Sequence, residues 1–168
     1  MKRIKNFLQP QEASIIKNAM EGVEFPWYNS HVVDESHLGD IPANQNFQFC
    51  HKFYYDSVPT SNLSHILNAL CAKINPYQWV RIKANLLPRT ERILEHGMHT
   101  DCIPKNANVT TAVYYVNTCN GYTRFEDGKK FKSIANSLIE FPSTMKHTGS
   151  TCTDEKYRIV INLNYIKV

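Results

Sequence analysis

The sequence of 168 residues lacks any long hydrophobic run. No stretch approaches the roughly 20 apolar residues that a membrane-spanning helix needs. The first residues, Met1 to Asn6, also lack an apolar core of signal-peptide length. No run of Lys and Arg is longer than two residues, and the net charge is only +4, so the composition does not demand a nucleic-acid partner. These absences predict a protein that works without a membrane.

Paired cysteine motifs, internal repeats and low-complexity tracts are absent too. The five cysteines are scattered, odd in number and without a C-x-x-C pair. This usage is typical of reduced thiols in a cytoplasmic protein rather than of a disulfide framework. With 42% hydrophobic and 20% charged residues, the chain has the composition of an ordinary globular protein. Its length suits one domain, 1–168, with a sizeable core.

Helical patterns are confined to the first half of the chain. Apolar residues recur at helical spacing up to Gly22, and a second helix is expected between residues 60 and 76. An alternating aromatic stretch over 46–55 predicts a strand, and the polar residues 34–46 predict a loop. We therefore interpret 1–78 as helical support with the first strands.

From Trp79 onwards the pattern changes to short strands. Alternating or β-branched stretches occur at 79–87, 108–117, 122–126, 130–134, 137–141 and 157–166. The dipeptides Asn120-Gly121 and Asp127-Gly128 are strong turn signals between some of them. Many short strands with turns between them predict a sandwich or a barrel, so we interpret 79–168 as the barrel core.

His99 and Asp101 lie two residues apart and are both of types that commonly bind metal ions. Side chains two residues apart on an extended segment point to the same side, so both can hold one ion from a single strand end. His147 can close the site from a distant strand. Two imidazoles and one carboxylate with open positions opposite form the facial triad of non-heme Fe(II) oxygenases. The alternative is a chance His-x-Asp pair without a ligand role.

Arg158 lies in a run of Ile, Val and Leu. A guanidinium in an apolar strand is costly unless an anion accompanies it. Arg158 is therefore either half of a structural ion pair or a clamp that holds the carboxylate of a small molecule through two hydrogen bonds.

Taken together, these pieces resemble the 2-oxoglutarate and Fe(II)-dependent dioxygenases, and most of all their prolyl-hydroxylase-like branch. The resemblance covers residues 79–168 well and the N-terminal part more loosely. Its pieces, in family order, are His99-Thr-Asp101, Thr111-Ala-Val-Tyr-Tyr115-Val-Asn117, Gly121-Tyr-Thr123-Arg-Phe125, Phe141-Pro, His147 and Arg158. It implies a mostly β fold with flanking helices, the double-stranded β-helix, which is a jelly-roll, cupin-like barrel.

The resemblance also assigns roles to individual residues. The Fe(II) ligands would be His99, Asp101 and His147. The residues that bind 2-oxoglutarate would be Arg158, through its distal carboxylate, with Tyr115, Thr123 and Asn85. The implied reaction consumes 2-oxoglutarate and O2, releases succinate and CO2, and hydroxylates a C–H bond, with ascorbate supporting activity.

The substrate implied by the resemblance is a prolyl or other amino-acid residue, or a small molecule. Two departures count against peptidyl proline: Tyr122 replaces a family glycine, and Leu87 stands near the place of a frequent family tyrosine. Asn162 and Asn164 follow Arg158 where the nucleic-acid demethylase branch usually has a second arginine, so a nucleic acid is not expected.

Two other classes of protein remain open for this sequence. One is a non-catalytic jelly-roll module that binds a small molecule without turnover. The other is a zinc hydrolase that uses the same three ligands and a zinc-bound hydroxide, but it leaves Arg158 and Tyr115 unexplained. Cys102 adjoins the candidate ligands, yet soft-ligand chemistry needs a second thiolate nearby.

Overall fold

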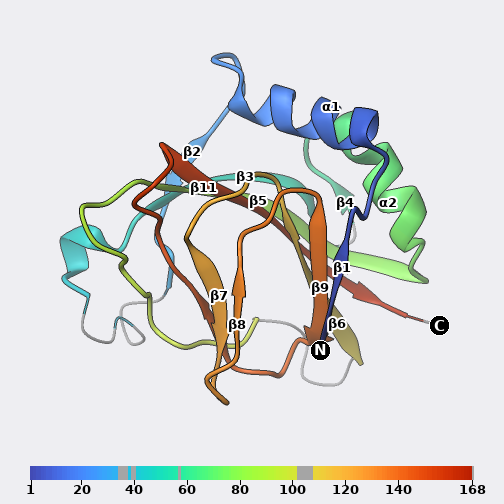
Figure 1. Cartoon of the computed structure of the whole chain (residues 1–168). Helices are drawn as coiled ribbons and strands as arrows, with labels where there is room; N and C mark the ends of the chain where they lie inside the picture. Colours follow the sequence, from blue (N-terminus) through green and yellow to red (C-terminus); the bar gives the residue numbers. More distant parts are fainter. Residues whose placement is uncertain (34–37, 39–40, 57, 102–107, 168) are drawn as a thin grey trace.

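The computed structural model describes residues 1–33, 38, 41–56, 58–101 and 108–167 (Figure 1). Cys102, the loop expected around Pro104 and part of the loop expected at 34–46 lie outside the described residues. Within the described ranges the strands form two antiparallel sheets with two α-helices beside them. No helix in these ranges is long and apolar enough to span a membrane.

The larger sheet contains eight of the described strands. Their spatial order is β1 (Lys2–Lys5), β9 (Ser137–Pro142), β6 (Val109–Tyr115), β11 (Tyr157–Ile166), β5 (Gln78–Pro88), β3 (Gln48–Tyr55) and β2 (Tyr28–Ser30), and β4 (Val58–Pro59) pairs with β3. The C-terminal strand β11 lies at the centre, paired with β6 on one side and β5 on the other. Segments from both ends of the chain therefore build the wall on which the polar residues of β5 and β11 are placed.

The smaller sheet contains β10 (His147–Gly149), β7 (Tyr122–Phe125) and β8 (Lys130–Lys132) in that order. The β7–β8 hairpin turns at Gly128, whose φ of +83° is a conformation that glycine adopts without steric cost. Figure 1 shows this sheet in front of the larger one. The two sheets form the walls of a flattened barrel.

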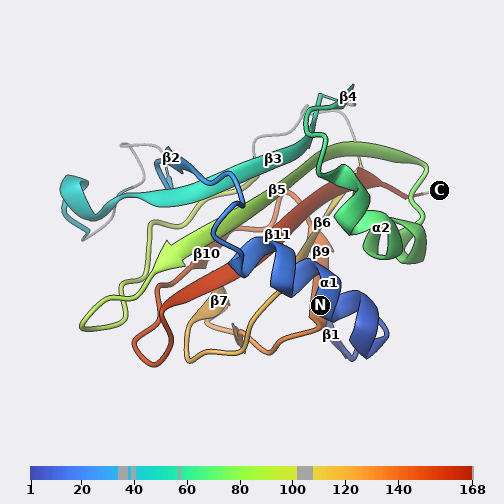
Figure 2. The same ribbon diagram turned by 90° about the horizontal axis from the view of Figure 1, so that it is seen from above.

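Alternation along the strands of the larger sheet separates two hydrophobic clusters. On β6, Ala112 and Tyr114 belong to the cluster under the helices, whereas Val113 and Tyr115 belong to the cluster inside the barrel. The first cluster includes residues of α1 (Pro10–Glu21), of the 3-10 helix η3 (Ser64–Leu67) and of α2 (Asn68–Ile74). Figure 2 shows α1 lying across β11. The helices thus cover the outer face, which leaves the inner face for a site.

The predicted fold class is confirmed. Each strand predicted after Trp79 is present, and the described strand β3 matches the prediction at 46–55. The second predicted helix is divided into η3 and α2, and it ends at Asn75, whose φ of 43° breaks the helix before Pro76. The short strands β1, β2 and β4 were not predicted, because two to four residues carry too little periodicity to be recognised; β10 is the strand on which His147 was expected, although no bounds were predicted for it.

Candidate active site

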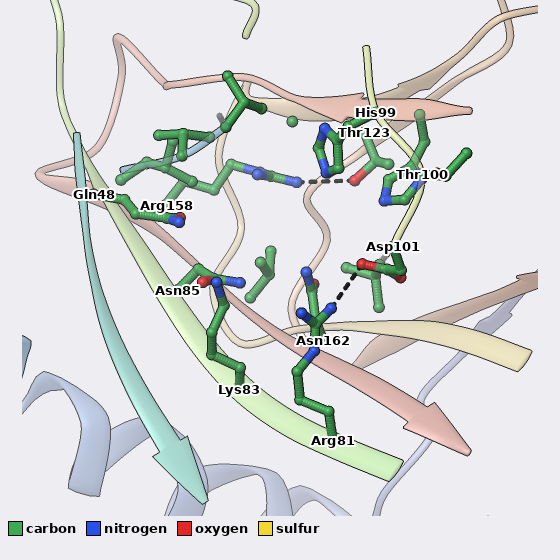
Figure 3. A pocket seen from close by; sticks show the side chains of 17 residues that line it. Gln48, Arg81, Lys83, Asn85, His99, Thr100, Asp101, Thr123, Arg158 and Asn162 are labelled. Carbon is green, nitrogen blue, oxygen red and sulfur yellow. Dashed lines mark hydrogen bonds and ion pairs between the residues drawn. The ribbon is translucent and has the colours of Figure 1, made fainter. Parts of the chain in front are cut away.

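A cavity of about 290 Å³ lies inside the barrel, against the inner faces of β5 and β11 (Figure 3). Six of the seven predicted site residues line it: His99, Asp101, Thr123, His147, Arg158 and Asn85. The seventh, Tyr115, does not line the cavity and lies behind Thr123, with its hydroxyl 3.0 Å from the Thr123 hydroxyl. The fold therefore brings residues from distant parts of the sequence to one pocket.

The two histidines face each other across a short antiparallel bridge. The backbones of His99 and His147 exchange hydrogen bonds of 3.0 and 2.9 Å, and the ring centroids are 4.8 Å apart. The Nδ1 atom of each ring lies near a carbonyl oxygen two residues earlier, at 3.1 Å from Gly97 and 3.0 Å from Met145. A ring that donates Nδ1–H to a carbonyl keeps Nε2 as a lone-pair donor, which is the tautomer that binds metal through Nε2.

Asp101 is held in place by three hydrogen-bond donors. Arg81 donates to one carboxylate oxygen at 2.7 Å, and the Thr111 hydroxyl at 2.5 Å and the Asn164 amide at 2.9 Å donate to the other. Arg81 comes from β5, Thr111 from β6 and Asn164 from β11, three adjacent strands of the larger sheet. The carboxylate is therefore anchored at the barrel wall on the side of β5.

Charges and burial set the protonation of these ligands. Burial by itself would raise the pKa of Asp101, but Arg81, His147 and the hydrogen bonds from Thr111 and Asn164 outweigh it and lower the pKa below its ordinary value. Burial and the neighbouring His147 lower the pKa of His99. An ionised carboxylate and a neutral imidazole are the forms that bind a metal ion.

Arg158 is the largest side chain in the interior, with 1% of its surface exposed. Its Nε donates to the Ser133 hydroxyl at 2.7 Å and one terminal nitrogen donates to the Thr123 hydroxyl at 3.0 Å. No carboxylate of the described residues forms an ion pair with it. A structural ion pair, one of the two interpretations from sequence, is therefore not found in the described part of the chain. A buried cation of this kind calls for an anionic ligand.

Thr123 connects Arg158 to Tyr115, which does not line the cavity. Its hydroxyl oxygen lies 3.0 Å from both the Arg158 guanidinium and the Tyr115 hydroxyl. Tyr115 is fully buried, and its ring lies 5.8 Å below the guanidinium carbon. Burial raises the pKa of the Tyr115 phenol, which keeps it a neutral hydrogen-bonding group. Tyr115 thus contacts both residues proposed to hold the co-substrate, Thr123 and Arg158, and its assignment to co-substrate binding stays a prediction.

Gly121 makes room for the Arg158 side chain. A Cβ atom at this position would lie 2.7 Å from the Arg158 Cδ and 2.7 Å from the Thr151 carbonyl oxygen. We expect Gly121→Ala to lower the free energy of unfolding by about 1–3 kcal/mol through overpacking, measured by urea denaturation. The control is Glu24→Ala, because Glu24 is exposed and its truncation creates no clash and needs no positive φ. Equal stability of the two variants would contradict the close packing at Gly121.

Comparison with known proteins gives a consistent result at the level of structure. A prolyl hydroxylase from Trichoplax adhaerens, solved with a hypoxia-inducible-factor peptide, is 15% identical with a TM-score of 0.67, over 99% of this chain and 83% of that one. A Pseudomonas putida prolyl-4-hydroxylase is 12% identical with a TM-score of 0.59, over 99% and 92%. The α-ketoglutarate-dependent non-heme epimerase SnoN of nogalamycin biosynthesis is 10% identical with a TM-score of 0.67, over 98% and 75%.

The chain has the fold of the 2-oxoglutarate/Fe(II) oxygenases. No protein-family model matches the sequence, and no curated protein matches it either. At these identities the likeness establishes the oxygenase fold alone, so the activity has to be argued from the residues in the pocket.

The ligands offered by this oxygenase fold suit a metal ion, with one adjustment. The two imidazoles present free Nε2 atoms, but the ligand atoms of His99, Asp101 and His147 do not all lie within 4.8 Å of one another. The reason is that Arg81, Thr111 and Asn164 bind both oxygens of Asp101 at the wall. A carboxylate offers about four lone-pair sites, so Asp101 can turn one oxygen to a metal and keep a hydrogen bond with the other.

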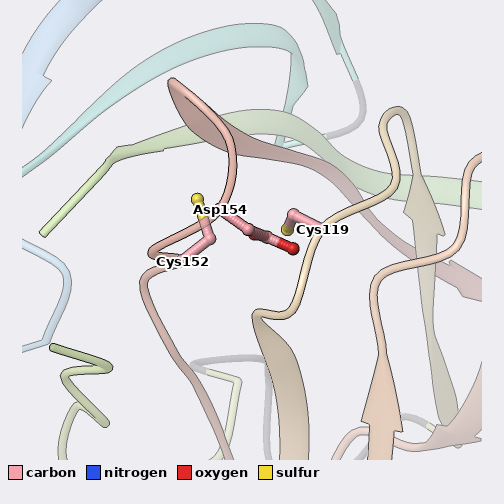
Figure 4. A group of neighbouring side chains, drawn as sticks. All are labelled: Cys119, Cys152 and Asp154. Atoms are coloured by element: carbon pink, nitrogen blue, oxygen red, sulfur yellow. The ribbon is translucent and has the colours of Figure 1, made fainter.

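A different group does bring three ligand atoms within 4.8 Å of one another in the described residues: Cys119, Cys152 and Asp154 (Figure 4). The two thiols are buried, and Asp154 is exposed with both carboxylate oxygens 3.0 Å from the Asn120 N–H. A hydrogen bond from Cys152 lowers the pKa of Cys119 to about 7. A structural zinc site almost always has four ligands, and this group supplies three, so we do not assign a metal to it.

Sequence reasoning missed the cationic side of the pocket. Arg81 and Lys83 line the cavity from β5, on the same face as Asn85, and Gln48 lines it from β3. The strict alternation over 79–87 was the available signal, because it places these polar residues on one face. From sequence, the polar face of a strand is normally assigned to solvent. Here that face points into the barrel, because the smaller sheet covers it.

Proposed function

We propose that the protein is a 2-oxoglutarate- and Fe(II)-dependent dioxygenase that hydroxylates a C–H bond of its substrate. The observation that carries the proposal is Arg158: a buried guanidinium without a carboxylate partner in the described chain, in one cavity with two imidazoles whose Nε2 atoms make no hydrogen bond to the described residues. A structural role explains neither the missing anion nor the paired histidines. A keto diacid that reaches from a metal ion to Arg158 explains both.

In this proposal His99, Asp101 and His147 hold Fe(II), and their arrangement leaves coordination positions open for 2-oxoglutarate and O2. When bound, the iron would supply the oxidative chemistry in which substrate, 2-oxoglutarate and O2 give hydroxylated substrate, succinate and CO2. The chain itself keeps the ligands in the correct protonation state. Arg81, Thr111 and Asn164 hold Asp101 ionised, and burial keeps the His99 ring neutral.

The proposed co-substrate contacts follow from the hydrogen bonds around Arg158. The Ser133 and Thr123 hydroxyls and the Ser150 carbonyl oxygen fix the guanidinium, and we expect the remaining N–H of each terminal nitrogen to bind the distal carboxylate. Asn85 lies between Arg158 and Lys83 in Figure 3, is 4% exposed and has a buried side-chain oxygen without a partner. It completes the polar wall of the pocket beside the co-substrate.

A prolyl or other amino-acid residue, or a small molecule, is the proposed range of substrates. Two of the compared structures are named as prolyl hydroxylases and one as an epimerase, so the shared fold supports no single choice. Leu87 lines the pocket from β5, where the family often has a tyrosine, which argues for a less polar contact at that point. We place the protein in the cytoplasm, since its four described cysteines are free thiols.

The test is succinate formation by purified protein supplied with Fe(II), 2-oxoglutarate, O2 and ascorbate. We expect slow release without substrate, faster release with the correct one, and none without O2. A binding module would bind 2-oxoglutarate but release no succinate. A zinc hydrolase would be active with zinc and without O2, so either result would contradict the proposal.

A further inference from the structure

Lys83 is a cation in the pocket that the proposed reaction does not use. It lies on β5 between Arg81 and Asn85 on the same face of the strand, and Figure 3 shows its amine turned toward the cavity. It is only partly exposed, and no described residue forms a hydrogen bond or an ion pair with it. Asp101, the acid that shares its cavity, is already bound by Arg81, Thr111 and Asn164.

The environment of Lys83 is unfavourable for a cation. Burial lowers the pKa of its amine and the charge of Arg81 lowers it further, with a smaller effect from Lys52; Cys50 and the Asp101 carboxylate raise it, but they do not outweigh the burial. Lys52 is the residue opposite Lys83 on β3, so the three cations form a strip across two adjacent strands. An opposite charge beside the amine would relieve both the repulsion and the lost hydration.

The charges of a loaded pocket leave Lys83 unmatched. Its described lining carries three cationic side chains, Arg81, Lys83 and Arg158, against one carboxylate, Asp101. Fe(II) and the 2-oxoglutarate dianion together would add no net charge, so the three cations and one carboxylate would still leave the loaded pocket with a net charge of +2. Arg158 would take the distal carboxylate and Arg81 already pairs with Asp101, so the amine of Lys83 remains for another anion.

Strand register separates this position from the co-substrate clamp. On β11 the residue opposite Lys83 is Asn162, and the residue opposite Arg81 is Asn164, which holds Asp101. Arg158 lies four residues from Asn162, which corresponds to about 13 Å along a strand. Lys83 is therefore at the metal-ligand end of the pocket, where a substrate has to approach, and Arg158 is at the other end.

We propose that the substrate is a small anionic molecule, and that Lys83 binds its carboxylate or phosphate group and so directs a C–H bond toward the metal ligands. The identification of this anion as the substrate rests on the proposed function, whereas the existence of an anion site at Lys83 does not. Arg81 is already paired with Asp101, and Lys52 is exposed and does not line the cavity, so Lys83 is the cation left to bind the anion. Asn85 lines the same cavity, and its amide N–H is the part of the side chain that could donate a hydrogen bond to the anion.

The experiment follows Lys83 directly and needs no turnover. Lysines of the wild-type protein are reductively methylated with a ¹³C label, which keeps their charge, and the Lys83 signal is assigned by its absence in Lys83→Met. The protein, loaded with Zn(II) and 2-oxoglutarate, is titrated with acetate and separately with inorganic phosphate. We expect a saturable shift of the Lys83 signal, and the anion that saturates at the lower concentration identifies the group.

The internal control is Lys17, an exposed lysine on α1 that pairs with Glu21. A Lys83 signal that moves no more than that of Lys17 with either anion would overturn the proposal. We expect Lys83→Met to change the 2-oxoglutarate concentration needed for half-saturation less than twofold. A tenfold rise would also overturn the proposal, because Lys83 would then bind the co-substrate. If the Lys83 signal shifted saturably but the protein released no succinate, the proposed oxygenase function would be overturned and the proposed anion site would stand.

Discussion

Replacing Arg158 with alanine is expected to raise the 2-oxoglutarate concentration needed for half-saturation at least tenfold. A hydrogen bond to a charged group contributes about 1.5–3 kcal/mol, and each 1.4 kcal/mol is about a tenfold change in affinity. The pocket offers no second buried cation near Thr123 in the described chain that could replace the guanidinium. Calorimetric titration of 2-oxoglutarate into Mn(II)-loaded protein measures the effect without turnover.

Two further variants make the Arg158 result specific. Arg158→Lys keeps the positive charge but loses the planar fork that binds Ser133 and Thr123, so we expect it to recover only part of the affinity. Arg92→Ala removes an exposed arginine and should leave the affinity unchanged. If a folded Arg158→Ala protein bound 2-oxoglutarate like the wild type, another residue would hold the distal carboxylate. Near-ultraviolet circular dichroism establishes whether each variant is folded.

Removing a metal ligand has the other large expected effect. Loss of a residue that supports a ligand typically costs about 10–100-fold in metal affinity, so loss of a ligand itself should cost at least a hundredfold. We expect His99→Ala and Asp101→Ala to abolish detectable Fe(II) binding in anaerobic equilibrium dialysis. The matched control is His31→Ala, because His31 is exposed and does not line the pocket.

Asp101 deserves a second variant, because it has a structural partner as well. Asp101→Ala would leave the Arg81 guanidinium without its ion pair, which costs stability independently of metal. Asp101→Asn keeps an oxygen and the hydrogen-bonding shape but loses the charge, so we expect weaker Fe(II) binding with less loss of stability. Tight Fe(II) binding by either variant would show that Asp101 stays with Arg81 and is not a metal ligand.

Strand periodicity accounts for most of what could be predicted of the fold. The alternating stretches became β5, β6, β9 and β11 because each has an apolar face that must be covered on one side. Periodicity does not reveal which sheet a strand joins. β10 has only three residues. It pairs with β7, and its first residue, His147, also pairs with His99 through an isolated bridge. Its neighbours in space, not its own residues, make it a strand.

The candidate site was predictable as a list of residues but not as an arrangement. The signal was an order of residues along the chain that matches the family order: His99, Asp101, His147 and Arg158. The same resemblance assigns Tyr115 to co-substrate binding, which stays a prediction; what the structure adds is the hydrogen bond from the Tyr115 hydroxyl to Thr123, which the chain order did not indicate. Asn120-Gly121 indicated a turn, and the close approach of Arg158 to Gly121 could not be read from that dipeptide.

The sequence by itself determined which faces of the strands are apolar and which residues can bind a metal or an anion, because side-chain chemistry and alternation are local properties. Only the tertiary structure decided that the polar face of β5 points inward, that Asp101 pairs with Arg81 and that Arg158 has no acidic partner in the described chain. These facts depend on pairing between segments far apart in the sequence, such as the hydrogen bond between Arg81 and Asn164, which are 83 residues apart. Local patterns carry no information about which distant charge a side chain will meet.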